Sequence, residues 1–240
     1  MRIDHIRQRV MRSLLSITIV ISFFVVPVVV ADEALNKKAG DTISSFSRWV
    51  IAADYAADAP ILVTVGGESL LYRPGDVILW KSEGTRIGEL SGHQTAVWAV
   101  DVSADGKLVA TAGYDGLIKV WDLQSRKLKS DLKQHKGWVR SLAFSPDGSR
   151  LVSAGEDGKV FLWNTQDGKA AISVAAHKGP VTAVAFSPNG KTFVTGGGDN
   201  LVKVWNAADG TAIQTLAGHE DTIWSIAYSP TRSQFVSTGA

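Results

Sequence analysis

Residues 135–175 read HKGWVRSLAFSPDGSRLVSAGEDGKVFLWNTQDGKAAISVA. Three turn sequences divide this stretch, and each ends in a glycine that accepts the left-handed backbone of a tight turn. The turns are Ser145–Gly148, Glu156–Gly158 and Gln166–Gly168. The segments between them are short and apolar, without a helical period: Trp138–Phe144, Leu151–Ala154, Lys159–Trp163 and Ala170–Ala175. They predict one four-stranded antiparallel sheet.

The same pattern recurs every 42 residues along the chain. Three residue types keep this step: His93, His135, His177 and His219; Trp121, Trp163 and Trp205; Asp115, Asp157 and Asp199. A degenerate first copy aligns Trp49–Tyr55 with Trp138–Phe144 and has Phe46 in place of the histidine. The final segment, Phe235–Ala240, aligns with Leu151–Glu156, so the chain stops partway through a further copy.

These units resemble the WD40 repeat, which has Gly-His near its start and Trp-Asp near its end. Gly92-His93 and Gly218-His219 match the first dipeptide and Trp121-Asp122 the second; Trp163-Asn164 and Trp205-Asn206 are near variants. The resemblance implies an all-β fold, a β-propeller of four-stranded antiparallel blades. Propellers have ~4–8 blades, and the resemblance implies that about seven is the commonest number in this family. The sequence supplies about four and a half, the last of them truncated, so we expect an incomplete propeller and a fragment of a longer, bacterial-type exported protein.

The propeller is expected to occupy residues 45–240, after a linker at residues 32–44. The approximate repeats are 45–91, 92–133, 134–175, 176–217 and the truncated 218–240.

Residues 1–31 are expected to form a signal peptide cleaved after Ala31, or a membrane anchor. Arginines precede a nearly unbroken apolar run at residues 14–30, and Val29-Val30-Ala31 suits a signal peptidase. The run is close to the shortest length that spans a bilayer, ~17 residues, so anchoring remains the alternative. Both readings predict an exported protein, periplasmic or extracellular.

Composition excludes several function classes. The chain has no cysteine, which rules out disulfides, thiolate metal sites and a cysteine nucleophile within these residues. Its net charge of +2 comes from the arginines of the first twelve residues, and the remainder is nearly neutral. We therefore expect no nucleic-acid partner, and contact with a membrane only through an uncleaved leader.

Histidine near serine or threonine and aspartate resembles the catalytic triad of a hydrolase. Because the same set of residues recurs from blade to blade, we expect it to have a structural role. In the family these residues form a buried hydrogen-bond chain. The resemblance implies three sets here: His93, Thr111, Asp115 and Trp121; His135, Ser153, Asp157 and Trp163; His177, Thr195, Asp199 and Trp205. We expect no catalytic residue, no metal site, because the histidines sit in different blades, and no cofactor.

Function is expected on the top face, where the repeats differ from one another. The variable positions are Trp98, Tyr114, Arg140, Glu156, Thr182 and Trp224. Tryptophan, tyrosine and arginine are enriched in protein-binding hot spots, which predicts a non-catalytic scaffold for protein partners. Two alternatives remain: Trp98 and Trp224 pack between blades, or the chain serves a larger exported enzyme or c-type cytochrome whose catalytic domain lies beyond residue 240.

Overall fold

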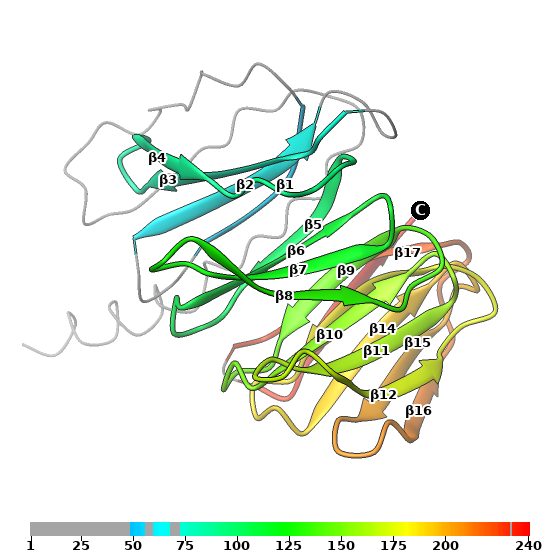
Figure 1. Cartoon of the computed structure of the whole chain (residues 1–240). Helices are drawn as coiled ribbons and strands as arrows, with labels where there is room; N and C mark the ends of the chain where they lie inside the picture. Colours follow the sequence, from blue (N-terminus) through cyan, green and yellow to red (C-terminus); the bar gives the residue numbers. More distant parts are fainter. Residues whose placement is uncertain (1–48, 56–59, 68–72, 231) are drawn as a thin grey trace, which may run out of the picture.

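The computed structural model describes residues 49–55, 60–67, 73–230 and 232–240 (Figure 1). Its strands form four four-stranded sheets and one two-stranded sheet, antiparallel throughout. The expected leader at residues 1–31 and the linker at residues 32–44 lie outside the described residues. Among the described residues there is no helix with the length and apolarity needed to cross a bilayer.

Each sheet is formed by consecutive strands in chain order. The first contains β1 (Trp49–Tyr55), β2 (Ile61–Gly67), β3 (Asp76–Lys81) and β4 (Arg86–Glu89). The second contains β5 (Val97–Val102), β6 (Leu108–Gly113), β7 (Leu117–Asp122) and β8 (Lys127–Lys133). The third contains β9 (Val139–Phe144), β10 (Arg150–Gly155), β11 (Lys159–Asn164) and β12 (Ala170–Ala175). The fourth contains β13 (Val181–Phe186), β14 (Thr192–Gly197), β15 (Val202–Asn206) and β16 (Ala212–Leu216), and the fifth β17 (Ile223–Tyr228) and β18 (Phe235–Gly239).

This arrangement confirms the all-β fold of incomplete propeller blades. The first strands of successive sheets, β1, β5, β9, β13 and β17, lie side by side, and the remaining strands of each sheet extend outward from them (Figure 1). The four strands expected in residues 135–175 are present. The first begins one residue later than expected, at Val139, and Trp138 just before it packs against the rings of Trp98 and Tyr114.

The central strands of each blade bury both of their faces. In β10, Leu151 joins the hydrophobic cluster shared with the second sheet, whereas Val152 joins the cluster shared with the fourth. In β11, Trp163 faces the second sheet and Leu162 the fourth. Side chains alternate across a strand, so these strands need apolar residues on both faces, and a polar residue such as Ser153 there needs a buried hydrogen-bond partner. This requirement explains the continuous apolar runs in each repeat.

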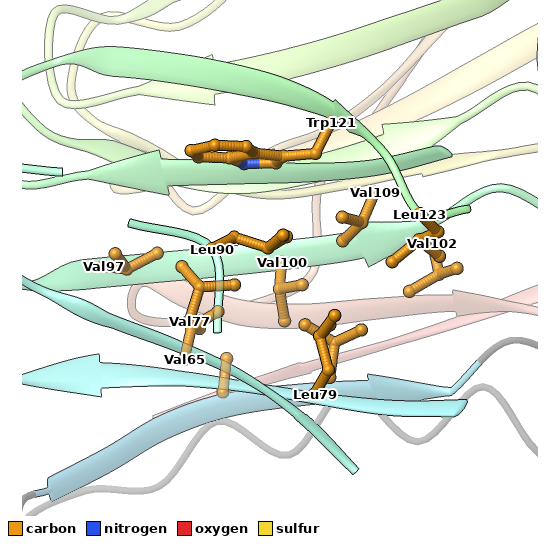
Figure 2. Packing of buried hydrophobic residues seen from close by; sticks show 12 residues of the cluster. Val65, Val77, Leu79, Leu90, Val97, Val100, Val102, Val109, Trp121 and Leu123 are labelled. Atoms are coloured by element: carbon orange, nitrogen blue, oxygen red, sulfur yellow. The ribbon is translucent and has the colours of Figure 1, made fainter. Parts of the chain in front are cut away.

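Figure 2 shows the cluster between the first two sheets. Val65, Val77 and Leu79 of the first sheet meet residues of the second. The second sheet contributes Val97, Val100, Val102, Val109, Trp121 and Leu123, and Leu90 lies in the connection between the sheets. Burial of these side chains at about 25 cal/mol per Å² is the main force that holds neighbouring blades together.

Carboxylates also link the inner strands of the first three blades. Asp54 Oδ2 accepts a hydrogen bond from the backbone N–H of Val102 at 2.7 Å. One blade further on, Asp101 Oδ2 accepts from the N–H of Phe144 at 2.6 Å. The acceptors satisfy strand-edge N–H groups that would otherwise be buried without a partner. The later repeats have alanine at this position, namely Ala143, Ala185 and Ala227.

The buried position of these two carboxyl groups raises their pKa values. Burial raises the pKa of the Asp54 carboxyl from 3.8 to about 7. Burial and the neighbouring Asp54 raise the pKa of Asp101 well above its ordinary value. A folded-state pKa above the unfolded one means that the unfolded chain ionises first as pH rises. The associated stability is fully present below about pH 4 and is lost as pH rises through about 7.

Replacing Asp54 with asparagine should flatten this pH dependence. Asp54→Asn keeps a carbonyl oxygen for the Val102 N–H but carries no charge, so it avoids the penalty of ionising a buried group. We expect the Tm advantage of the variant over wild type to grow between pH 4 and pH 8, measured by circular dichroism. A constant difference across this range would contradict the assignment.

Candidate functional site: the bulge pocket and the blade hydrogen-bond networks

The first strand of each sheet has a β-bulge at the same place. The pairing register shifts around one residue in each of β1, β5, β9, β13 and β17. The five bulge residues are Ile51, Trp98, Arg140, Thr182 and Trp224. A bulge residue has no cross-strand partner, and the bend redirects its side chain away from the regular face of the sheet. The fold therefore frees one position per blade from pairing.

The five bulge residues line a single pocket of about 60 Å³. Each inner strand contributes its bulge residue and the residues that follow it, such as Ala99 and Val100 of β5 or Ser141 and Leu142 of β9. The pocket therefore marks the axis around which the blades are arranged. An isoleucine, two tryptophans, an arginine and a threonine give its wall four kinds of side chain on five blades.

An aromatic–arginine cluster lies beside this pocket, formed by Trp98, Tyr114, Trp138, Arg140 and Glu156. The Arg140 guanidinium carbon is 4.4 Å from the ring centroid of Trp138 and 5.2 Å from that of Trp98. Arg140 Nε donates to Glu156 Oε2 at 2.7 Å. The Tyr114 ring stacks on Trp138 with a centroid separation of 3.9 Å. Cation–π contacts and an ion pair thus hold the arginine in one orientation.

The structure places the six expected top-face residues in different settings. Trp98 lines the pocket and also packs against Trp138 of the next blade, so both interpretations of Trp98 describe part of its contacts. Trp224 lines the pocket and remains 45% exposed. The Thr182 hydroxyl lies within hydrogen-bond distance of the backbone carbonyls of Gly196 and Ile223, and its contact with Ile223 ties the fourth blade to the fifth. Tyr114, Arg140 and Glu156 belong to the cluster.

Sequence reasoning missed Trp138, the residue at the centre of the cluster. It stands three residues after His135, where the other histidine-containing repeats have Ala96, Pro180 and Thr222 and only the degenerate first copy also has a tryptophan, Trp49. The same comparison between repeats that singled out Arg140 would have found it.

In the third blade the expected four residues form one hydrogen-bond chain. Trp163 Nε1 donates to Ser153 Oγ at 2.9 Å, and Ser153 Oγ lies 2.8 Å from His135 Nε2. His135 Nδ1 lies 3.0 Å from Asp157 Oδ1. One proton arrangement satisfies every group: the hydroxyl donates to Nε2, and the Nδ1–H donates to the carboxylate.

The fourth blade has the same hydrogen-bond network. Trp205 Nε1 donates to Thr195 Oγ1 at 2.9 Å, Thr195 Oγ1 lies 2.7 Å from His177 Nε2, and His177 Nδ1 lies 2.7 Å from Asp199 Oδ1. A Cβ at Gly155 or Gly197 would overlap the imidazole of the same blade, which explains the glycine at this position of each repeat.

The second blade departs from the expected set at Asp115. Trp121 Nε1 donates to Thr111 Oγ1, which lies 2.8 Å from His93 Nε2. His93 Nδ1, however, has no hydrogen-bond partner among the described residues. Asp115 Oδ1 accepts from the N–H of Leu117 at 3.0 Å, the turn hydrogen bond that Asp157 makes with Lys159, but Asp115 does not reach the histidine. The expectation that Asp115 orients His93 is therefore wrong for this structure.

The first and fifth blades contain parts of the same hydrogen-bond network. Trp80 Nε1 donates to Thr64 Oγ1 at 2.8 Å in the degenerate first blade, so the indole–hydroxyl half is retained there. In the fifth blade His219 Nε2 lies 2.8 Å from Ser237 Oγ.

The burial of these hydrogen-bond networks indicates a structural role. The hydroxyl-bearing residues Thr111, Ser153 and Thr195 are 0% exposed, so an external substrate cannot reach them. Burial lowers the pKa of His93 to about 4. It also lowers the pKa of His135 and His177, despite their hydrogen bonds to Asp157 and Asp199. The imidazoles are therefore neutral links between blade strands at neutral pH.

The two aspartates at equivalent positions should differ in their contribution to stability. Asp157→Ala removes the acceptor of His135 and two backbone acceptor interactions, and should cost about 1–3 kcal/mol. Asp115→Ala removes the turn interaction with Leu117 and should cost less than about 1 kcal/mol. Urea unfolding of both variants measures the difference. Equal losses would contradict the assigned geometry.

Comparison with known proteins agrees with this architecture. The family model for the WD domain, G-beta repeat, matches residues 84–122, 126–164, 168–206 and 210–240. Each full match begins at the outer strand of one blade and ends with the third strand of the next, so the repeat unit is offset from the blade.

The curated relatives include eukaryotic translation initiation factor 3 subunit I from several fungi. The Phaeosphaeria nodorum protein is 34% identical over 86 residues, which is 36% of this chain and 24% of that protein. The Neosartorya fischeri protein is 29% identical over 83 residues, which is 35% of this chain and 23% of the relative. The Scheffersomyces stipitis protein is 44% identical over 50 residues, which is 21% of this chain and 14% of the relative.

This chain thus spans about a quarter of the length of the first of these relatives. The family model covers more than half of the chain, and its matches coincide with the repeated strands. The chain belongs to the WD40 repeat family, whose propellers are protein-interaction scaffolds.

Proposed function

We propose that this chain is a non-catalytic scaffold of an exported assembly, and that it binds a protein partner through the face formed by the bulge residues. The observation that carries the proposal is the pocket lined by all five bulge residues. These positions are free of strand pairing, and the five blades place four different residue types there. Such variation suits recognition, whereas positions that only support the blades keep the same residue types.

The chemistry of the cluster supports a protein partner. Tryptophan, tyrosine and arginine supply large contact areas and often dominate binding energy at protein interfaces. Trp98, Trp138 and Glu156 already fix Arg140, whose side chain is 17% exposed. A preorganised side chain loses little conformational entropy on binding, which favours affinity. Trp224, at 45% exposure, adds an apolar contact on the same pocket.

Similarity to a named subunit also supports the scaffold role. The fungal relatives are named as a subunit of translation initiation factor 3. A subunit is by definition part of a larger assembly. From these relatives we transfer to this chain only membership in an assembly, because the aligned part covers about a quarter of the first of those proteins.

Export is proposed from the sequence of residues 1–31. The arginine-rich start, the apolar run at residues 14–30 and the short residues before Asp32 support a cleaved signal peptide.

Loss of two cluster side chains should weaken partner capture without unfolding the protein. Trp98→Ala together with Arg140→Ala removes the central contacts of the proposed interface. We expect the amount of partners cross-linked to the full chain to fall by at least about tenfold, the loss typical of hot-spot residues. Trp49→Ala is a matched control, because Trp49 is 55% exposed and lies outside the pocket lining. Capture that falls equally in the control, or in neither variant, would refute the docking face.

The mature N-terminus tests export separately. The full chain, produced from its own start codon and recovered from outside the cytoplasm, should begin at Asp32 when sequenced by Edman degradation. Recovery of the chain in the cytoplasm with residues 1–31 intact would refute the proposed export.

A further inference from the structure

The outer strand of the second blade carries a strong local positive charge. Five basic residues lie between residues 126 and 136, against one acidic residue, Asp131: Arg126, Lys127, Lys129, Lys133 and Lys136. All five are exposed. Asp131 is already shared between Lys119 at 3.3 Å and Lys133 at 3.1 Å. Within the described ranges no ion pair involves Lys127, Lys129 or Lys136.

The other outer strands lack this charge. The strands β12 and β16, with sequences AAISVA and AIQTL, contain no charged residue. In β4 the two charged residues form an ion pair, Arg86 with Glu89, at 2.6 Å. Lysines on edge strands often prevent sheets from joining edge to edge. The uncharged edges of β12 and β16 show that the propeller does not require lysines for that purpose.

The backbone of β8 presents these lysines outward along the rim. The pairing of β7 with β8 has a bulge at Lys129, a position where the other blades have Ile87, Ala171 and Ile213. From Lys127 to Lys133 the strand extends for about 20 Å at ~3.3 Å per residue. Leu128 of the same strand is 45% exposed.

We propose that β8 is a second docking surface, which binds an extended acidic peptide segment of a partner. Charge complementarity identifies the occupant as acidic. The basic strip is one strand wide, because the outer strands on both sides, β4 and β12, offer no unpaired basic side chain. An occupant that matches this width is a single extended segment. A bilayer surface or a nucleic-acid duplex would need a broader basic surface. This site is separate from the bulge pocket and does not depend on the function proposed for that pocket.

Binding of a model acidic peptide to the full chain tests the proposal. The probe is a fluorescein-labelled decapeptide of alternating glutamate and threonine, followed by fluorescence anisotropy at physiological salt. The variant Lys127→Glu/Lys129→Glu/Lys133→Glu should weaken binding at least tenfold. The control Lys169→Glu/Lys178→Glu/Lys191→Glu changes net charge equally at exposed lysines elsewhere, and should stay within twofold of wild type.

A milder variant keeps the test informative if charge reversal disturbs folding. Lys127→Gln/Lys129→Gln leaves the Asp131 ion pairs intact and should weaken peptide binding at least threefold. Hydrogen exchange should show protection by the peptide within residues 126–136. Equal weakening by both triple variants, protection elsewhere, or tighter binding to phosphatidylglycerol vesicles or to a ten-nucleotide single-stranded RNA would each overturn the proposal.

Discussion

A blade of this protein cannot be stable alone, because its central strands are apolar on both faces. Leu151 and Val152 are adjacent in β10 and both are fully buried, one against each neighbouring sheet. A two-sided apolar sheet must be covered twice, and stacking further sheets of the same kind is the solution that a repeated sequence provides. The clusters between successive blades follow from this requirement. Hydrogen bonds between and within blades are also required, because stacking buries backbone N–H groups and indole nitrogens that need acceptors.

The polar ties differ along the ring although the apolar packing repeats. Asp54 and Asp101 accept from the next inner strand in the first two junctions. Ser141 takes this role in the third, where the N–H of Val184 donates to its hydroxyl at 3.3 Å. In the fourth junction the direction is reversed, because the Thr182 hydroxyl donates to the backbone carbonyl of Ile223. The hydrophobic clusters therefore hold every junction together in the same way, while the hydrogen bonds give each junction its own dependence on pH and substitution.

The repeat, its strands and most of its turns could be predicted because they depend on local pattern. The 42-residue step, the glycine turns and the alternating apolar segments lie within single repeats, and the structure confirms the blades that they predict. Contacts between blades were harder to foresee. Asp54 and Asp101 have no polar equivalent in the later repeats, so periodicity gave no signal for them. Asp115 occupies the same repeat position as Asp157, and both carboxylates accept from the N–H two residues later, in Leu117 and Lys159. Only Asp157 also reaches its histidine, whereas His93 Nδ1 has no such partner.

The bulge in each inner strand separates two kinds of position within one repeat. Its neighbours Val97, Val139, Val181 and Ile223 are fully buried and nearly uniform. The bulge residues range from isoleucine to arginine without any change in the surrounding register. A substitution at a bulge therefore alters what the pocket presents and leaves the strand register and the buried clusters in place, while at Trp98 and Thr182 it also removes a contact with the next blade. A lineage of duplicated repeats can therefore acquire a new binding specificity by changing five side chains, without searching again for a stable fold.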